Sequence, residues 1–355
     1  MATIRDIAKA CGVSAMTVSA VLNKRHGAAS TETRDRILRV VDEMGYHPNA
    51  VARALTRRYT GTIGIVIVYQ HGDSLTGDRY FGPVLDGVFE ACKRQGQRAL
   101  MITEETWEEA HDNLNSYFDG HCDGLIFVLP LLSDEFLVSV QRQNIPFVII
   151  GETRSVPSLS MVDLDNVSAG YDATRHLIEA GHRRIAHIMG SAFFLSASQR
   201  ETGYRQALAE CDIPFDPSLV FQGHYTQQSG LEQGRELLTT LDGRLPTAIF
   251  CGDDWIALGA LNALAERGLS VPGDISVVGV NNDKETVSTP PGITTIDHPL
   301  RLIGSRATEA VLRRIREKTP SGEQILVRGA LVERGSVARL PAVAFERSAS
   351  LTVSQ

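Results

Sequence analysis

From Thr62 onward, short apolar segments alternate with amphipathic helical segments, and this alternation restricts the fold more than any other feature. Strands are predicted at Thr62–Tyr69, Arg98–Thr103, Gly124–Val128, Phe147–Ile150, Met161–Val162, Ile185–Met189, Thr247–Cys251 and Ile275–Val280. Helices are predicted near residues 81–95, 107–119, 134–143, 166–180, 198–210, 227–240, 254–267 and 299–316. Such alternation is typical of α/β folds with parallel sheets and right-handed crossovers. About eight units exceed one ordinary sheet, so we expect a body of two lobes.

The predicted body spans residues 61–340. We assign residues 61–163 and 293–320 to a first lobe, and residues 164–292 and 321–340 to a second. A late pair of strands, Ile325–Val327 and Leu331–Glu333, is expected to close the second lobe, before a loosely ordered tail over residues 341–355. Ligands of parallel α/β folds bind beyond the carboxyl ends of the strands, so a ligand site is expected there.

The first 47 residues predict a small helical domain instead. Thr3 is placed to cap a first helix, Ser14 a second over Ala15–Leu22, and Ser30 or Thr31 a third that ends near Met44. Helix, glycine-bearing turn and second helix fit a helix-turn-helix, whose second helix enters the major groove of DNA. An unspecific helical hairpin gives the same pattern. Residues 48–60 are predicted to form a hinge helix, about 49–57, and a linker.

The distribution of charge favours nucleic acid over the alternatives for this head. The chain has a net charge of −7, yet residues 1–60 carry ten Lys/Arg against five Asp/Glu, a net +5, which leaves −12 for the remainder. A basic head on an acidic body can bind phosphate while the body stays clear of it. In the second helix, Ala15, Met16 and Ser19 are expected to face base edges, and Thr17 to hold phosphate.

Two long segments, TIRDIAKACGVSAMTVSAVLN and STETRDRILRVVDEMGYHPNAVARAL, closely resemble the head of LacI/GalR-family regulators. The similarity continues through DGLIFV, GHRRIAHI, TAIFCGDDWIALGAL and VPGDISVVGVNN. The resemblance implies a helix-turn-helix head joined to a two-lobed body similar to periplasmic binding proteins. It further implies an effector-controlled regulator, expected to be a repressor, that acts as a homodimer on pseudo-palindromic operator DNA in the cytoplasm.

The resemblance assigns DNA contacts to the head and the hinge. The residues concerned are Thr3, Ser14, Ala15, Met16, Thr17, Ser19, Ala20, Asn23, Arg25, His26, Asn49, Ala52, Arg53 and Leu55. Leu55 matches the hinge leucine that wedges into the minor groove at the operator centre. Ala20 departs from the family, which usually has an arginine there that would reach guanine. The operator half-site is therefore expected to differ at that contact. Phosphate contacts from Lys24, Arg25 and His26 could compensate, although a solvated loop fits them as well.

The resemblance also places an effector site in the body. Its expected residues are Tyr80, Phe81, Phe194, Ser196, Arg200, Tyr225, Asp253, Trp255 and Asn281, with Asp165 and Glu152 as weaker candidates. Phe194 replaces a second arginine of the purine-sensing relative, and Asn281 stands where many relatives have Asp. With one arginine evident and several aromatic rings, we expect a sugar rather than a purine or an acid.

Other function classes find little support in the sequence. A dehydrogenase would need a G-x-G-x-x-G motif after the first strand, where GTIGIVIVYQHGD stands, and no nucleophile or metal-ligand motif is present. We therefore expect no enzyme activity, cofactor or metal. The five scattered cysteines predict reduced thiols, and neither an export signal nor a membrane span is expected. A periplasmic sugar-binding protein is one alternative, but it would lack the helix-turn-helix head. A ligand sensor that acts only through protein partners is another, and it would not retard DNA in an electrophoretic mobility-shift experiment.

Overall fold

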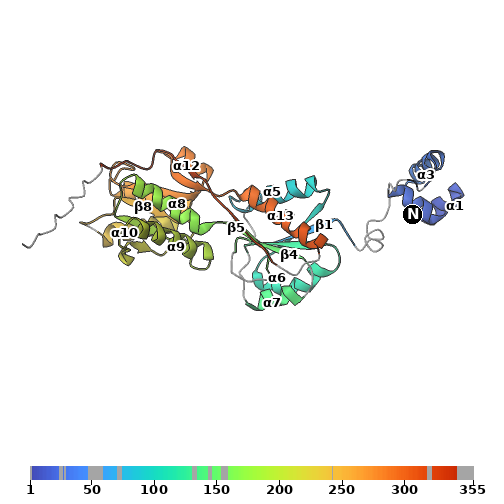
Figure 1. Cartoon of the computed structure of the whole chain (residues 1–355), viewed down its shortest axis with the longest axis horizontal. Coiled ribbons are helices and arrows are strands. Elements are labelled where there is room, and N and C mark those ends of the chain that lie inside the picture. The colour runs from blue at the N-terminus through green and yellow to red at the C-terminus, as the bar shows by residue number, and fades with distance from the viewer. Residues whose placement is uncertain are drawn as a thin grey trace, which may run out of the picture. The chain divides into compact units, whose positions relative to one another are not determined.

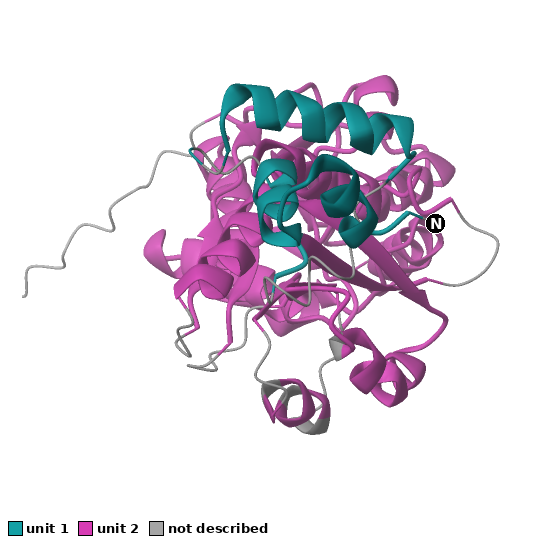
Figure 2. Ribbon diagram, turned by 90° about the vertical axis from the view of Figure 1, so that its right-hand side faces the viewer, with its two compact units in different colours: residues 1–61 teal, residues 62–355 magenta. Residues whose placement is uncertain are grey.

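The computed structural model describes residues 2–23, 27, 29–46, 59–69, 74–129, 134–142, 146–152, 159–241, 243–317 and 322–341. They belong to two compact units, residues 1–61 and 62–355, coloured teal and magenta in Figure 2. The predicted hinge helix, with Asn49, Ala52, Arg53 and Leu55, lies outside the described residues, as do Lys24, Arg25, His26 and the tail beyond Pro341.

The first unit contains the three predicted helices: α1 (Ile4–Cys11), α2 (Ala15–Leu22) and α3 (Thr31–Glu43). Thr3 and Asp6 form a capping box at the start of α1, and Gly12 ends that helix with a φ of 61°, where glycine has no Cβ to clash. Ile7, Val18 and Ile37, one from each helix, are fully buried against one another. The predicted helical head is confirmed.

The second unit contains two six-stranded sheets, as the strand–helix alternation predicted. The first has the strand order β11-β5-β4-β3-β1-β2 and the second the order β12-β10-β9-β8-β6-β7. The strands are β1 (Thr62–Val68), β2 (Arg98–Glu104), β3 (Gly124–Val128), β4 (Phe147–Ile150), β5 (Met161–Leu164), β6 (Ile185–Ile188), β7 (Val220–Phe221), β8 (Ala248–Cys251), β9 (Ser276–Asn281), β10 (Thr294–Asp297), β11 (Gln324–Val327) and β12 (Leu331–Val332). Every described pairing is parallel except that of β10 with β12.

Helices cover both faces of each sheet. They are α5 (Phe81–Arg94), α6 (Trp107–Asp112), η1 (Asn113–Phe118), α7 (Asp134–Arg142), α8 (Asn166–Glu179), α9 (Leu195–Glu210), η2 (Pro217–Leu219), α10 (Gln227–Thr240), α11 (Asp254–Glu266), α12 (Lys284–Ser288) and α13 (Leu300–Glu317). Figure 1 shows α5 and α13 on one side of the first sheet, with α6 and α7 on the other. The predicted helix over 107–119 divides into α6 and η1.

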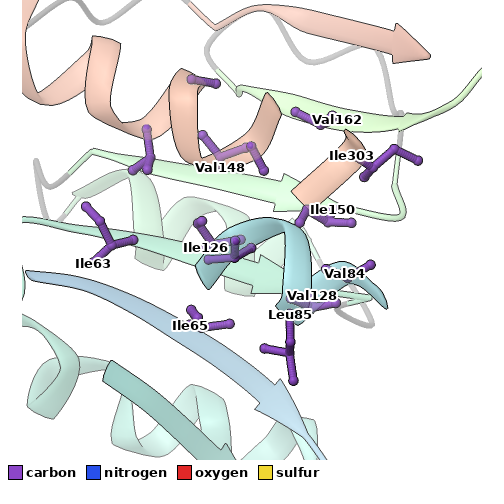
Figure 3. Packing of buried hydrophobic residues seen from close by; sticks show 14 of the residues in the cluster. Ile63, Ile65, Val84, Leu85, Ile126, Val128, Val148, Ile150, Val162 and Ile303 are labelled. Atoms are coloured by element: carbon purple, nitrogen blue, oxygen red, sulfur yellow. The ribbon is translucent and has the colours of Figure 1, made fainter. Parts of the chain in front are cut away.

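The first sheet is buried on both faces because its central strands β3 and β4 carry no polar side chain. Ile63 and Ile65 of β1 point towards α5 and α13, where Figure 3 shows them with Val84 and Ile303. Val66, between positions that face the other way, packs with residues of η1 and α7. Near-continuous apolar strands are typical of parallel sheets that are covered on both sides. Among the described helices, none is long and apolar enough to cross a membrane.

The exchange of strands between the lobes differs from the prediction. The late strands were expected to close the second lobe together, but β11 pairs with β5 in the first sheet, and only β12 joins β10 in the second. We also assigned residues 293–320 to the first lobe, whereas β10 pairs with β9 in the second sheet. The order of elements along the chain did not predict these pairings, because the chain passes from one sheet to the other after β5, after β10 and after β11.

Candidate effector pocket and DNA-reading helix

The second helix of the head, α2, presents an uncharged surface. Ser14 caps it by accepting a hydrogen bond from the Thr17 N–H (3.0 Å), and the two hydroxyls lie 2.9 Å apart. Val18 and Val21 are buried on its inner face, whereas Met16 is 80% exposed. An N-terminal turn that is capped and solvent-facing is the part of a recognition helix that contacts base edges.

The remaining predicted head contacts are only partly free to bind. Ser19 and Ala20 are half-buried on α2. The side-chain amide of Asn23 donates to the backbone carbonyl of Ser19 (2.8 Å) and contacts its hydroxyl (3.3 Å). The hydroxyl of Thr3 donates to Asp6 Oδ2 (2.7 Å). None of the described side chains of α2 is charged, so apolar atoms dominate what this helix can offer to a base.

The second unit contains a pocket of about 190 Å³ lined by residues of both lobes. Seven of the nine predicted effector residues line it: Tyr80, Phe194, Ser196, Arg200, Tyr225, Asp253 and Asn281. The other two lie just behind the lining. Phe81 makes edge contacts with Tyr69 and Tyr80, and the ring of Trp255 lies 5.0 Å beneath the Arg79 guanidinium. Of the weaker candidates, Asp165 instead caps α8, and Glu152 is buried outside the lining.

Arg200, from α9, is held in place by the second lobe. Its Nε donates to Asn166 Oδ1 (2.9 Å), its Nη1 donates to the Gly252 carbonyl, and its guanidinium lies 5.8 Å from the Tyr225 ring centre. The Tyr225 hydroxyl lies 2.8 Å from the Ser196 hydroxyl. A Cβ at Gly190 would stand 2.1 Å from the Tyr225 ring, so only glycine leaves room for this wall of the pocket.

The pocket contains a second arginine, which corrects our expectation of one. Arg79, immediately before α5 in the first lobe, lies 3.1 Å from both Asp253 Oδ2 and Asp283 Oδ2, and it donates to the Tyr225 carbonyl (3.0 Å). Burial raises the pKa of Asp253 and raises that of Asp283 to about 6, while the charge of Arg79 acts to lower both pKa values. These two ion pairs therefore link the lobes within the described part of the chain. They also balance the positive charge of Arg79 with two carboxylates.

Elsewhere in the lining, the imidazole of His298 lies close to two other polar side chains, Asn281 and Asp163. His298 Nδ1 lies 3.2 Å from Asn281 Oδ1, and His298 Nε2 lies 3.9 Å from Asp163 Oδ1. Neither His298 Nε2 nor the buried Tyr80 hydroxyl has a hydrogen-bond partner among the described residues. Burial lowers the pKa of His298 to about 3 and raises that of Asp163 to about 6.

Sequence reasoning missed several residues of the lining: Arg79, Asp163, Asn166, Asp283 and His298. For most of them a signal existed, because Asp163 directly follows the predicted strand Met161–Val162, Asp283 comes soon after another, and Arg79 precedes the expected Tyr80. His298 directly follows β10, a strand that we did not predict, so nothing marked it as standing at the carboxyl edge of a sheet.

The chain is similar to known bacterial regulators along nearly its whole length. A profile of the bacterial regulatory proteins of the lacI family matches residues 3–49, and a periplasmic binding protein-like domain matches residues 174–337. The HTH-type transcriptional repressor PurR of Aliivibrio fischeri (strain MJ11) is 33% identical over 339 residues, which cover 95% of this chain and 98% of that protein. PurR of Vibrio campbellii is 32% identical over 342 residues, 96% of this chain and 100% of that protein.

Two solved structures give the same result for the fold. A complex of the transcriptional regulator CelR with cellobiose has a TM-score of 0.71 and 30% identity, and it covers 95% of this chain and 100% of its own. A lac repressor dimer bound to operator and the anti-inducer ONPF has a TM-score of 0.80 and 26% identity, covering 95% and 99%. These relatives are transcriptional regulators rather than enzymes.

Proposed function

Because this chain belongs to the LacI family of bacterial regulatory proteins and is a transcriptional repressor, we propose that a sugar bound in the pocket controls its affinity for operator DNA. The chain binds a pseudo-palindromic operator as a homodimer in the cytoplasm. Each subunit places α2 in one major groove, and the hinge segments, with Leu55, fold between the two half-sites.

The arrangement of charge in the pocket is the observation that carries the sugar proposal. Arg79 is matched by Asp253 and Asp283, and the charge of Arg200 is offset by a third carboxylate, Asp163, so the lining has more carboxylates than arginines and disfavours an anion. The walls add the aromatic faces of Phe194 and Tyr225, which can stack on the apolar face of a pyranose. A neutral ligand rich in hydroxyls fits this lining better than an acid or a phosphate.

The size of the pocket favours a small effector. Its volume of about 190 Å³ is below the range of about 300–1,000 Å³ that is typical of sites for drug-sized ligands. One ring, with its hydroxyls, is therefore the expected size. The similarity to the regulator that was solved with cellobiose supports a carbohydrate, although that ligand has two rings. A purine base is the second candidate, because it could also stack on the ring of Phe194 or of Tyr225.

An exposed apolar edge supports the homodimer. Strand β2 is the terminal strand of the first sheet, and its Leu100 and Met101 are 41% and 44% exposed. On α5, which also covers this sheet, Phe89 is 41% exposed. Unpaired strand edges with apolar side chains are usually covered by a partner, and a two-fold operator requires two heads. We place the subunit interface along β2 and α5.

A screen of thermal unfolding tests the effector class. Neutral hexoses, cellobiose, purine bases, gluconate and glucose 6-phosphate are each added to the full-length protein, and the midpoint is compared with that of the protein alone. We expect a neutral sugar to raise the midpoint, with a shift that grows with the logarithm of its concentration once the site is saturated. A shift with purine bases alone would reassign the effector, and a shift with gluconate or the sugar phosphate alone would contradict the charge argument.

A further inference from the structure

We propose that Tyr80, Asp163 and His298 form a subsite that binds hydrogen-bond donors of the effector, namely two neighbouring hydroxyls of a sugar ring. This inference rests on the proposed function, because it takes the pocket to be the effector site. The inference identifies the protein atoms that still lack a hydrogen-bond partner. It therefore specifies the groups that a ligand must place next to them.

The protonation of His298 follows from its neighbour. The carbonyl oxygen of Asn281 can only accept, so the hydrogen of the imidazole must be on Nδ1, which donates to it across 3.2 Å. With its pKa lowered to about 3 by burial, the ring is neutral, and Nε2 carries a lone pair rather than a hydrogen. Among the described residues this lone pair has no donor.

Asp163 presents a second acceptor to the same space. The carboxylate accepts hydrogen bonds from the Asn166 amide at Oδ2 (3.0 Å) and from the Leu164 N–H, and its Oδ1 lies 3.9 Å from His298 Nε2 with lone pairs left for a ligand. Two buried acceptors that face each other do not stabilise one another, since neither has a hydrogen to give. Both residues are less than one-tenth exposed. The pair is satisfied when hydrogens enter between the two atoms.

The Tyr80 hydroxyl completes the subsite from the first lobe. It is buried without a partner among the described residues, and the tyrosine ring lies edge-on to His298 with the ring centres 5.7 Å apart. Gly151 leaves space beside it, since a Cβ there would stand 2.9 Å from the hydroxyl oxygen. Two ligand hydroxyls can thus donate to Asp163 and His298, while a ligand oxygen accepts from Tyr80.

Two groups of polar side chains in the lining offer a ligand different partners. The donors of Arg79 are already used by Asp253 and Asp283, whereas beside His298 the unpaired atoms are the Nε2 acceptor and the Tyr80 hydroxyl, which can donate or accept. A ligand without donor hydrogens would leave His298 Nε2 buried and unpaired and would offer nothing to the remaining lone pairs of Asp163. Sites built to hydrogen-bond a hydroxyl reject analogues that lack it far more strongly than apolar pockets reject a missing methylene.

The test is calorimetric titration of full-length wild type, Tyr80→Phe, Asp163→Asn and His298→Phe with neutral hexoses, purine bases and gluconate. Tyr204→Phe is the matched control, because its buried hydroxyl bonds to the Ile185 carbonyl (2.8 Å) outside the pocket. We expect each pocket variant to weaken binding of the hexose at least about tenfold, while the control binds like wild type. Operator binding without any sugar serves as the check that each variant is folded.

Deoxyfluoro analogues of the bound hexose locate the donors. Fluorine removes the hydrogen of one hydroxyl, so we expect a large loss of affinity at two neighbouring positions in wild type and a much smaller one in Asp163→Asn or His298→Phe. A hexose that all variants bind equally overturns the subsite but leaves the sugar proposal standing. Binding of purine bases alone, with the same dependence on Asp163 and His298, overturns the sugar while the subsite holds. Binding of gluconate alone overturns the neutral sugar, and it overturns the subsite as well if the variants bind gluconate like wild type. Binding of no donor-bearing compound overturns both.

Discussion

At the scale of single residues, the chemistry of the pocket depends on which charges are already matched. Arg79 was absent from our predicted site, yet it faces two carboxylates that are 2% and 8% exposed. Buried carboxylates without a nearby cation favour their neutral form, so this arginine permits both to remain ionised. It also reaches across from the first lobe, which links closure of the pocket to a pairing of charges.

Arg79→Gln tests this role through the pH dependence of stability. Without the cation, the pKa values of Asp253 and Asp283 should rise above their already raised values, and the latter starts at about 6. A folded-state pKa above the unfolded value makes stability fall as pH rises towards it, so the loss relative to wild type should be larger at pH 8 than at pH 5. Because Arg79 is itself 30% exposed, we expect less than the about 3–5 kcal/mol of a fully buried pair. Equal losses of unfolding midpoint at the two pH values would contradict the assignment.

At the scale of elements, periodicity in the sequence predicted most helices and strands, because apolar runs and capping residues act locally. Thr3, Ser14 and Ser30 each cap the helix that we assigned to them. Strand β10 was missed because it is only four residues long, lies between Gly292 and Pro299, and contains a single aliphatic side chain, Ile296. Which sheet a late strand joins is not encoded locally, since β11 and β12 have similar apolar character but pair in different sheets.

The same distinction applies to the site. Tyr225 and Arg200 could be assigned from the motifs around them, but His298 depends on where β10 places it. Residues whose role comes from long-range pairing need the fold before they can be recognised.

Gly190→Ala tests the contact between the loop after β6 and the wall of the pocket. The added methyl would stand 2.1 Å from the Tyr225 ring, so the ring must move and its contact with Ser196 should be lost. We expect effector affinity to fall roughly tenfold or more, or about 1.4 kcal/mol, in calorimetry, with operator affinity of the ligand-free protein unchanged. An unchanged effector affinity would show that Tyr225 is not part of the binding surface.

Ala20→Arg tests the uncharged surface of α2. An arginine at this position can reach guanine, a contact worth about 1–3 kcal/mol of discrimination, so selected half-sites should gain a guanine at one position. Ala10→Arg, at an exposed position of α1, adds the same charge elsewhere and should raise affinity without changing the selected sequence. If wild type already selects that guanine with equal stringency, Ala20 is not at the expected contact.

At the scale of the whole molecule, we expect the effector pocket and the operator to influence each other through the predicted hinge and linker, residues 48–60. Leu55 lies in this stretch, outside the described residues. Leu55→Ala should weaken operator binding roughly tenfold or more, or about 1.4 kcal/mol, because the minor-groove wedge is lost. Effector affinity should remain that of wild type. Fluorescence anisotropy with labelled operator measures the first quantity and calorimetry the second, and equal operator affinity for the two proteins would remove the hinge from the account.

The most direct test of the coupling measures it from both sides. The operator dissociation constant is determined with and without saturating sugar, and the sugar dissociation constant with and without saturating operator, for the full-length protein. The account predicts that the two constants change by one common factor, within the range of about 5–150 that is typical of allosteric coupling. An operator dissociation constant that is the same with and without saturating sugar would contradict it.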